Sequence, residues 1–266
     1  MLSPGDRFEG YVIDAPAGHG GSATVYRAHE TRSPERVVAL KILARGHDGP
    51  AERARLRRES DYARRLRHPH VVEIYDSGPA WLAMEYAAGG TVTSLATVPN
   101  RVAALSQIAD ALDFIHAHDV VHCDVKPSNI LVAQDFYREG ALLIDFGNAR
   151  ASGESAVPYT THVTASLPYS PPELLTGAAV TGATDVYALA ATAVEMITGS
   201  PPFTATTQAA LTDSQLHRDP PRPSRDIDWL PRAFDSILAK AMAKSPTARY
   251  QSCAELIALI TRVVRD

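Results

Sequence analysis

The chain has 266 residues, of which 45% are hydrophobic and 21% are charged. This is the composition of an ordinary globular protein with enough apolar residues for a sizeable core. The formal net charge of -4 gives no general electrostatic reason to expect a nucleic acid or an anionic membrane as a partner.

Neither cysteine usage nor hydropathy points to secretion or to a membrane. The two cysteines, Cys123 and Cys253, imply no disulfide framework and favour a reducing compartment. The longest apolar stretch, residues 186–198, contains Glu195 and is shorter than the roughly 20 residues that span a bilayer. Residues 1–7 have neither the basic region nor the apolar run of a secretory signal. We therefore expect a cytoplasmic protein without a membrane segment.

The first third of the chain predicts a small antiparallel sheet with one helix. Residues 8–43 alternate apolar and polar positions around a glycine cluster, which predicts three antiparallel strands. Residues 51–67 lack Pro and Gly and end at His68-Pro69, which is typical of a helix. Residues 71–75 and 81–86 are two further predicted strands. Residues 1–86 are thus predicted to form a five-stranded lobe.

The remainder of the chain predicts a larger, mainly helical lobe. Residues 87–90 read Ala-Ala-Gly-Gly and form the expected exit from the sheet. Residues 102–118 carry apolar side chains at helical spacing, and residues 186–198 predict a buried helix. No internal repeat is visible. The expected fold class is α+β, with one domain over residues 1–266 divided into lobes at 1–86 and 87–266.

One short segment gathers residues suited to phosphoryl transfer. Residues 122–129 read His-Cys-Asp-Val-Lys-Pro-Ser-Asn, and Asp145-Phe146-Gly147 follows sixteen residues after Asn129. An attacking hydroxyl needs an acceptor such as Asp124, and cations must match the charge that spreads over the γ-phosphoryl oxygens. Lys126 could supply one positive charge, while Asn129 and Asp145 could hold Mg²⁺, or Mn²⁺ in its place.

With these motifs the chain resembles the eukaryotic-like (Hanks-type) protein kinases, whose catalytic loop reads H-R-D-x-K-P-x-N before D-F-G. The Asp-x-Lys-Pro order resembles the Ser/Thr kinases, particularly bacterial ones. Residues 38–41 look like the V-A-I-K strand, and residues 17–25 resemble the glycine-rich loop. Pro171-Pro172-Glu173 resembles the A-P-E motif, Asp185 the buried αF aspartate, and Arg249 the arginine that pairs with the glutamate. The resemblance implies a bilobal protein-kinase fold, with residues 51–67 as its αC helix.

The resemblance also assigns residues to an ATP site. Lys41 lies on an apolar strand, where an ammonium group is costly to bury without an anionic partner. Glu59 is the expected partner and Glu52 the alternative. The glycine cluster would let the backbone approach phosphates closely. The residues expected to bind the nucleotide are Ala17, Gly18, His19, Gly20, Gly21, Val25, Ala39, Lys41, Met84 (the gatekeeper), Glu85, Tyr86, Ala87 and Leu131.

The chain departs from the family pattern at several positions. Ala23 replaces the third glycine of the loop, and the residues after Asp185 lack the usual tryptophan and glycine. Ser166 stands where the family has a threonine beside Lys126. Cys123 replaces the arginine before the catalytic aspartate, which is typical of a non-RD kinase. Since that arginine binds a loop phosphate, we expect activity to depend only weakly on phosphorylation at Thr160, Thr161 or Thr164.

The expected activity is therefore ATP-dependent phosphorylation of serine or threonine in proteins, including autophosphorylation. The departures above keep a pseudokinase scaffold as an alternative, and the His-x-Asp and Asn pattern leaves a small-molecule phosphotransferase as another. Regulation through a homodimer or a protein partner is expected. A zinc site built on His116, His118 and His122 is disfavoured, because the resemblance places His122 at a hydrophobic-spine position of the family and the other two lie at a predicted helix end. A nucleic-acid stripe on the arginine-rich residues 51–67 is disfavoured because the arginines surround the helix.

Overall fold

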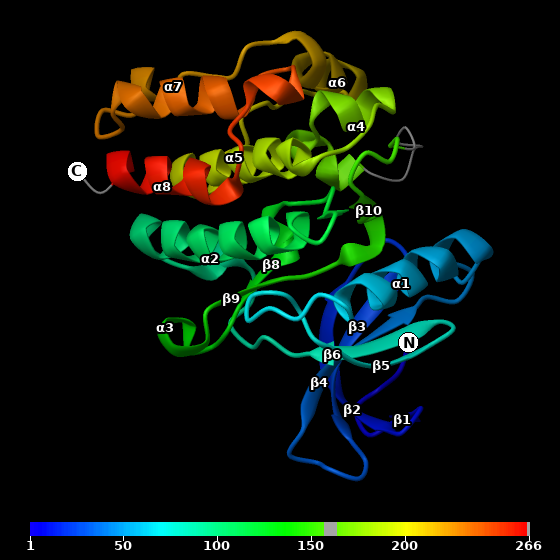
Figure 1. Ribbon diagram of the computed structural model, residues 1–266. Helices are drawn as coiled ribbons and strands as arrows, with labels where there is room; N and C mark the ends of the chain where they lie inside the picture. The colour runs from blue at the N-terminus through cyan, green and yellow to red at the C-terminus, as the bar shows by residue number, and fades with distance from the viewer. Residues whose placement is uncertain (157–163, 265–266) are drawn as a thin grey trace.

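The computed structural model describes residues 1–156 and 164–264, which form a small sheet-containing lobe and a larger helical lobe (Figure 1). This is the expected α+β, bilobal arrangement. The strands of the small lobe are β1 (Arg7–Phe8), β2 (Tyr11–His19), β3 (Ala23–Glu30), β4 (Val37–Leu43), β5 (Ile74–Gly78) and β6 (Trp81–Glu85). Within the described residues they form one antiparallel sheet in the order β1-β2-β3-β4-β6-β5.

Two details of the sheet differ from the sequence prediction. The predicted five strands gain a sixth, β1, whose two residues pair with the start of β2. The strand predicted at 71–75 instead runs over Ile74–Gly78, because Val71 forms a parallel bridge with Leu143 of the other lobe. Buried apolar residues precede and begin β5, so alternation alone did not fix its register.

Helix α1 (Pro50–Ala63) packs on the sheet through one face. Its buried residues are Leu56, Glu59, Ser60 and Ala63, which recur at helical spacing. The helix starts with a proline at its first position, where the missing N–H costs nothing. It ends four residues before the predicted Arg67. The spacing turns the carboxylate of Glu59 toward the interior of the protein, beside β4.

The large lobe is built around two helices. They are α2 (Val98–His116) and α5 (Gly182–Thr198); α2 begins four residues before the predicted start, with Thr97 as its N-cap. In Figure 1, α5 and α8 form a layer between α2 and α7. The other helices are α3 (Phe136–Glu139), α4 (Pro172–Thr176), α6 (Gln208–His217), α7 (Arg232–Ala241) and α8 (Cys253–Val264). Among the described residues, no helix is both long and apolar enough to cross a membrane.

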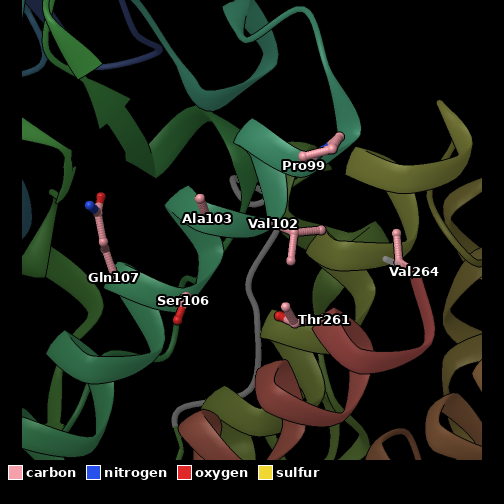
Figure 2. Close-up of a pocket in the computed structure, with 7 residues that line it drawn as sticks. All are labelled: Pro99, Val102, Ala103, Ser106, Gln107, Thr261 and Val264. Atoms are coloured by element: carbon pink, nitrogen blue, oxygen red, sulfur yellow. The ribbon is translucent and has the colours of Figure 1, made fainter. Parts of the chain in front are cut away.

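Short elements complete the fold. β7 (Val120–Val121) pairs with β10 (Arg150–Ala151), and β8 (Ile130–Val132) pairs with β9 (Ala141–Leu143). The 3-10 turns are η1 (Val92–Ser94), η2 (Pro127–Asn129), η3 (Phe146–Asn148), η4 (Thr164–Tyr169), η5 (Pro223–Arg225) and η6 (Pro246–Ala248). Figure 2 shows a groove between the start of α2 and the end of α8, lined by residues such as Pro99, Val102 and Val264.

Backbone hydrogen bonds join the two lobes along one edge. The N–H of Val72 donates to the Leu143 carbonyl at 3.1 Å, and the N–H of Leu143 donates to the His70 carbonyl at 2.8 Å. The segment that connects the lobes is held to β8 in the same way, because the N–H of Gly89 donates to the Val132 carbonyl at 2.9 Å. A Cβ on Gly89 would lie 2.4 Å from the carbonyl oxygen of Ala133. Only glycine therefore lets the connecting segment pass this close to β8.

Candidate active site

Asp124 lies at the centre of the polar segment that follows β7, and its carboxylate is held on one side only. Its Oδ2 accepts hydrogen bonds from Lys126 Nζ at 3.0 Å, Asn129 Nδ2 at 3.1 Å and Asn148 Nδ2 at 3.2 Å. Asp124 is 4% exposed, and its Oδ1 is buried without a hydrogen-bond partner in the part of the chain that the structure describes. A buried acceptor atom in a native site calls for a missing partner. The proton of a substrate hydroxyl would satisfy it.

Lys126 connects Asp124 to the segment that carries Ser166. Its Nζ donates to Ser166 Oγ at 2.6 Å as well as to Asp124. Ser166 belongs to η4, and its backbone carbonyl accepts a hydrogen bond from Ser170 Oγ at 2.9 Å. The serine that replaces the family threonine thus makes the expected contact. The arrangement places one ammonium group, which is only 14% exposed, beside the candidate base.

The sheet contributes a second lysine. Lys41 Nζ lies 2.7 Å from Glu59 Oε2 and 3.7 Å from Asp145 Oδ1. Burial alone would lower the pKa of Lys41, but the carboxylates of Asp145 and Glu59 outweigh it and raise that pKa. Glu59 and not Glu52 is therefore the carboxylate that meets Lys41. The ammonium group is charged and faces Asp145.

Asp145 adopts a left-handed backbone conformation, with φ of 65°, at the start of η3. This conformation is strained for a residue with a side chain. Its Oδ1 accepts the N–H of Gly147 at 3.3 Å, which helps to fix the turn. Burial would raise the pKa of Asp145, but Lys41 and then Arg55 outweigh it and lower that pKa. A carboxylate that stays ionised suits a hard cation such as Mg²⁺.

Two arginines of α1 reach the same turn, and the sequence interpretation missed their role. Arg55 Nη2 lies 3.4 Å from Asp145 Oδ2, and Arg58 Nη1 donates to the Gly147 carbonyl at 3.3 Å. A Cβ on Gly147 would lie 2.6 Å from Arg55 Nε. The signal in the sequence was helical spacing, because Arg55 lies three residues before Arg58 and four residues before Glu59. Among so many arginines it could not be singled out.

Asp185 of α5 anchors the backbone of residues 122–123, directly before the candidate base. Its carboxylate accepts the N–H of His122 at 2.8 Å, the N–H of Cys123 at 2.9 Å and His116 Nε2 at 2.8 Å. Burial would raise the pKa of Asp185, but the hydrogen bond from His116 leads the opposing effects and the pKa is lowered. Cys123 has φ of 63°, so Asp185 stabilises a strained conformation directly before the candidate base.

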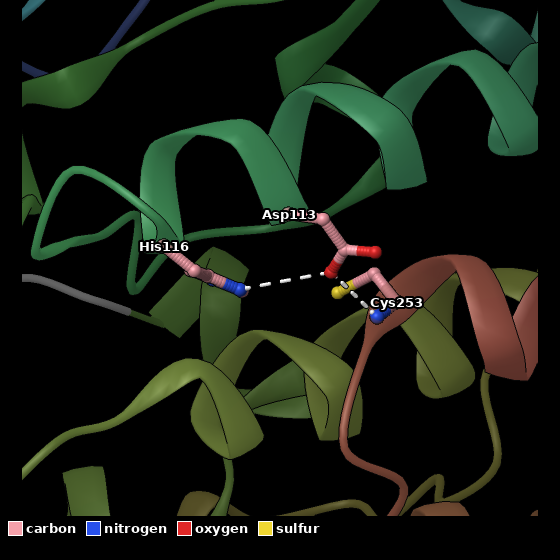
Figure 3. A group of neighbouring side chains, drawn as sticks. All are labelled: Asp113, His116 and Cys253. Carbon is pink, nitrogen blue, oxygen red and sulfur yellow. Dashed lines mark hydrogen bonds and ion pairs between the residues drawn. The ribbon is translucent and has the colours of Figure 1, made fainter.

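The three histidines near the segment do not share a site. His122 Nε2 is hydrogen-bonded to the Ile144 carbonyl at 3.0 Å. The rings of His122 and Phe146 make an edge-to-face contact, with 4.9 Å between their centroids. His118 Nδ1 bonds the Phe114 carbonyl at 2.8 Å, whereas His116 turns toward Asp185. A zinc site made of these histidines is therefore not formed. Figure 3 shows that His116 has other neighbours, Asp113 and Cys253.

The glycine cluster forms the tip of the hairpin between β2 and β3. Gly18 pairs with Val25 across the hairpin, and the N–H of Gly20 donates to the Ala23 carbonyl at 2.8 Å. Gly18, Gly20 and Gly21 do not adopt the positive φ that glycine permits. A Cβ on Gly18 or Gly21 would meet nothing within 4 Å. The glycines leave open space above the site, where a phosphate could approach the backbone.

The predicted adenine-binding residues lie on neighbouring strands of the small-lobe sheet and on β8 of the large lobe. Ala39 of β4 pairs with Met84 of β6, and both are buried. Val25 pairs with Lys41, while Leu131 lies on β8 of the large lobe. The connecting residues Glu85, Tyr86 and Ala87 follow at the end of β6. The N–H of Glu85 already donates to the Glu73 carbonyl at 2.9 Å, so it cannot also donate to the adenine ring.

The side chains present fit a nucleotide with Mg²⁺. The amide nitrogen of Asn129 is used by Asp124, so its amide oxygen is the atom that it can offer to a metal. Asp145 supplies a carboxylate, and Mg²⁺ prefers such oxygen ligands together with phosphate oxygens. Lys41 and Lys126 add positive charge from the two sides. The arrangement can polarise a phosphoryl group and accept a proton from a hydroxyl.

Two observations concern the predicted role of loop phosphorylation: the surroundings of Cys123 and the positions of the three threonines. Cys123 is buried in an apolar cluster with Val121, Ala156, Leu174 and Val180. Thr160 and Thr161 lie outside the described residues, and of Thr164 only its place in η4 is described.

The predicted pairing of Glu173 with Arg249 is confirmed. Arg249 Nη1 and Nη2 donate to the two Glu173 carboxylate oxygens at 2.6 and 2.9 Å, and both residues are buried. Such a bidentate pair fixes the end of the segment to the large lobe.

Comparison with known proteins agrees with the site. The protein-family model for the protein kinase domain matches residues 11–258 of this chain. The serine/threonine-protein kinases PknJ and PknD of Mycobacterium tuberculosis are 37% and 39% identical to this chain over 96% and 95% of its length. The chain spans only 45% and 39% of those two relatives. The crystal structure of the Mycobacterium tuberculosis PknI kinase domain is similar with a TM-score of 0.73 and 30% identity, covering 98% of this chain and 99% of that chain.

Proposed function

This chain belongs to the protein kinase family, and we propose that it transfers the γ-phosphoryl group of ATP to serine or threonine hydroxyls of proteins, its own chain included. The observation that carries the proposal is the carboxylate of Asp124. One of its oxygens is held by Lys126, Asn129 and Asn148, while the other is buried without a partner among the described residues. The unpartnered oxygen can therefore accept the proton of a substrate hydroxyl, as a general base does.

Each polar side chain of the site has a role in this reaction. Asp124 Oδ1 orients the attacking hydroxyl and accepts its proton. Lys126, 2.6 Å from Ser166 Oγ, faces the charge that develops on the transferred group, and Lys41 faces the phosphates from the sheet side. Asn129 and Asp145 would hold Mg²⁺. That ion, when bound, would neutralise charge on the phosphate oxygens.

The nucleotide lies between the lobes in this proposal. The apolar residues Val25, Ala39, Met84 and Leu131 support the flat surface of adenine, and the backbone near Ala87 supplies its hydrogen bonds. The open hairpin tip at Gly18–Gly21 covers the phosphates. Protein substrates and either a second copy of the chain or a regulatory protein are the proposed partners.

Incubation with labelled ATP, Mg²⁺ and casein tests the proposal. We expect label in casein and in the chain itself, and a loss of about 10²–10⁴-fold in Asp124→Asn, which removes the base. Asp145→Asn controls for metal-dependent transfer and should be inactive. Binding of magnesium nucleotide without any labelled protein would support a pseudokinase scaffold. ATP consumption that needs a small acceptor instead of a protein would support a small-molecule phosphotransferase.

We further propose that loop phosphorylation contributes little to activity. Cys123 occupies the position at which an arginine would bind a loop phosphate, and it is buried among apolar side chains. A thiol in that cluster provides no bidentate partner for phosphate. Turnover of a Thr160→Ala, Thr161→Ala double variant should therefore stay close to the wild-type value. A loss approaching a hundredfold would contradict the proposal.

A further inference from the structure

A second cluster of ligand-type side chains lies on the opposite side of His116 from Asp185. Asp113 and His116 lie one turn apart at the end of α2, and Cys253 begins α8 (Figure 3). One ligand atom from each residue lies within 4.8 Å of the other two. The chain brings Cys253 to Asp113 across 140 positions. The catalytic proposal uses none of these three side chains as a reacting group.

The ring of His116 lies between two carboxylates, and only one of its nitrogens is within hydrogen-bond distance of a carboxylate. Its Nε2 lies 2.8 Å from Asp185 Oδ2, and an ionised carboxylate is an acceptor, so Nε2 is the nitrogen that donates there. Its Nδ1 lies 3.9 Å from Asp113 Oδ1, which is longer than a hydrogen bond. Nδ1 is therefore the nitrogen that His116 can offer to a ligand.

Asp113 keeps enough capacity for a further bond. Its Oδ1 accepts the N–H of Cys253 at 2.8 Å, and its Oδ2 accepts the N–H of Ala254 at 2.9 Å. These bonds cap the start of α8. Each carboxylate oxygen has two lone pairs, and the side chain of Cys253 also hydrogen-bonds to Asp113, a bond that a metal ion between the two residues would replace.

The dimensions of the cluster suit a metal ion. For atoms 3.9–4.8 Å apart, a central point lies roughly 2.3–2.8 Å from each, close to the zinc–ligand distances of about 2.0–2.3 Å. A small inward movement of the side chains closes the difference. Cys253 is buried, but the side chains of Asp113 and His116 are 27% and 16% exposed, so solvent can reach their side of the cluster and complete the coordination.

The set of ligands selects the kind of metal. One sulfur, one imidazole nitrogen and one carboxylate oxygen form a mixed set that zinc binds, whereas Mg²⁺ prefers oxygen alone. A carboxylate on the remote nitrogen of a ligating histidine is the usual way in which proteins orient such a ligand. Asp185 provides that carboxylate here. A cation would also offset the negative charges of Asp113 and Asp185 on the two sides of His116.

We propose that Asp113, His116 and Cys253 form a zinc site, with a water molecule as the remaining ligand. Binding replaces the thiol proton of Cys253, which leaves to solvent, by a sulfur–zinc bond. The ion would tie α2 to α8 and, through His116 and Asp185, to the backbone of the catalytic segment. The site is separate from the proposed ATP chemistry and does not depend on it.

Titration of the full chain with Co²⁺, a spectroscopic substitute for zinc, tests the proposal. We expect a thiolate-to-cobalt charge-transfer band in the near ultraviolet that saturates at one ion per chain and is abolished by added Zn²⁺. Cys253→Ala should lose the band and weaken Zn²⁺ binding, measured calorimetrically, by at least ~100-fold. Cys123→Ala is the matched control, because it removes the other buried cysteine, and it should keep the band.

A second variant keeps the test decisive if Cys253→Ala folds poorly. Asp113→Asn retains a side chain that can cap α8 but removes the carboxylate charge, and we expect Zn²⁺ binding to weaken by about 10–100-fold. Zn²⁺ should raise the melting temperature of the wild type more than that of Asp113→Asn. The absence of a charge-transfer band in the folded wild type would overturn the proposal. A band that survives in Cys253→Ala would overturn it as well.

Discussion

Replacement of Arg55 by glutamine should tighten the binding of magnesium nucleotide. The Arg55 guanidinium lies 3.4 Å from Asp145 Oδ2, so it shares the carboxylate that would hold the metal. Two unit charges at this distance attract by about 5 kcal/mol at an effective dielectric constant of 20 and about 1.2 kcal/mol in water. The arginine side chain is 43% exposed, and such exposed pairs keep only about 1 kcal/mol. Loss of the competing cation should therefore increase metal affinity about fivefold, since about 1.4 kcal/mol corresponds to tenfold.

Isothermal titration with Mg²⁺ and ADP measures this change without any turnover. Arg57→Gln is the matched control, because Arg57 lies on the same helix, is 84% exposed and pairs only with Asp61 at 3.7 Å among the described residues. Its affinity should equal that of the wild type. Weaker binding by Arg55→Gln would refute the reasoning. It would mean that Arg55, which packs against Gly147, holds the turn in its metal-binding geometry instead of competing with the ion.

Three other substitutions test separate parts of the structure. Glu173→Gln leaves the buried Arg249 without its carboxylate, so the free energy of unfolding in urea should fall by about 3–5 kcal/mol; a loss below about 1 kcal/mol would contradict this. Burial, followed by Arg249, lowers the pKa of Lys244 to about 8 from 10.5, so the unfolded chain binds more protons between these values and stability should rise with pH from 8 to 10.5. Lys244→Met should show a flatter rise over that range. Ser166→Ala removes the 2.6 Å acceptor of Lys126 and should lower kcat by about tenfold, whereas Ser166→Thr should retain the wild-type rate.

The polar residues of the site could be predicted from the sequence because most of them lie in one short segment. Residues 122–129 carry the candidate base, a lysine and an asparagine within eight positions, so their proximity needs no knowledge of the fold. Lys41 needed an anionic partner, and Glu59 could be chosen because the family pairs this lysine with a glutamate of αC and Glu59 lies nine residues before His68-Pro69. The bilobal fold followed from the family resemblance and from strand and helix patterns.

Contacts that depend on tertiary packing could not be predicted. Cys253 and Asp113 are far apart in the sequence, and each is unremarkable in its own helix. Arg55 was one of many arginines on α1, and only the position of the turn at Asp145 distinguishes it. The register of β5 was missed because Val71 is buried against Leu143 rather than in the sheet. Hydrophobic periodicity indicates which side chains are buried, but it does not show against which residues they pack.

The two lobes are held together unequally on their two sides. Near His70 and Gly89 the contact is made by backbone hydrogen bonds, whereas near the turn after Asp145 it is made by the arginine side chains of α1. Partly exposed ion pairs break more readily than a backbone seam. The lobes should therefore separate first on the side of α1, while the backbone hydrogen bonds on the other side act as a hinge. In the proposed reaction, ADP would then leave after the arginine side chains of α1 lose their contacts with the turn that follows Asp145.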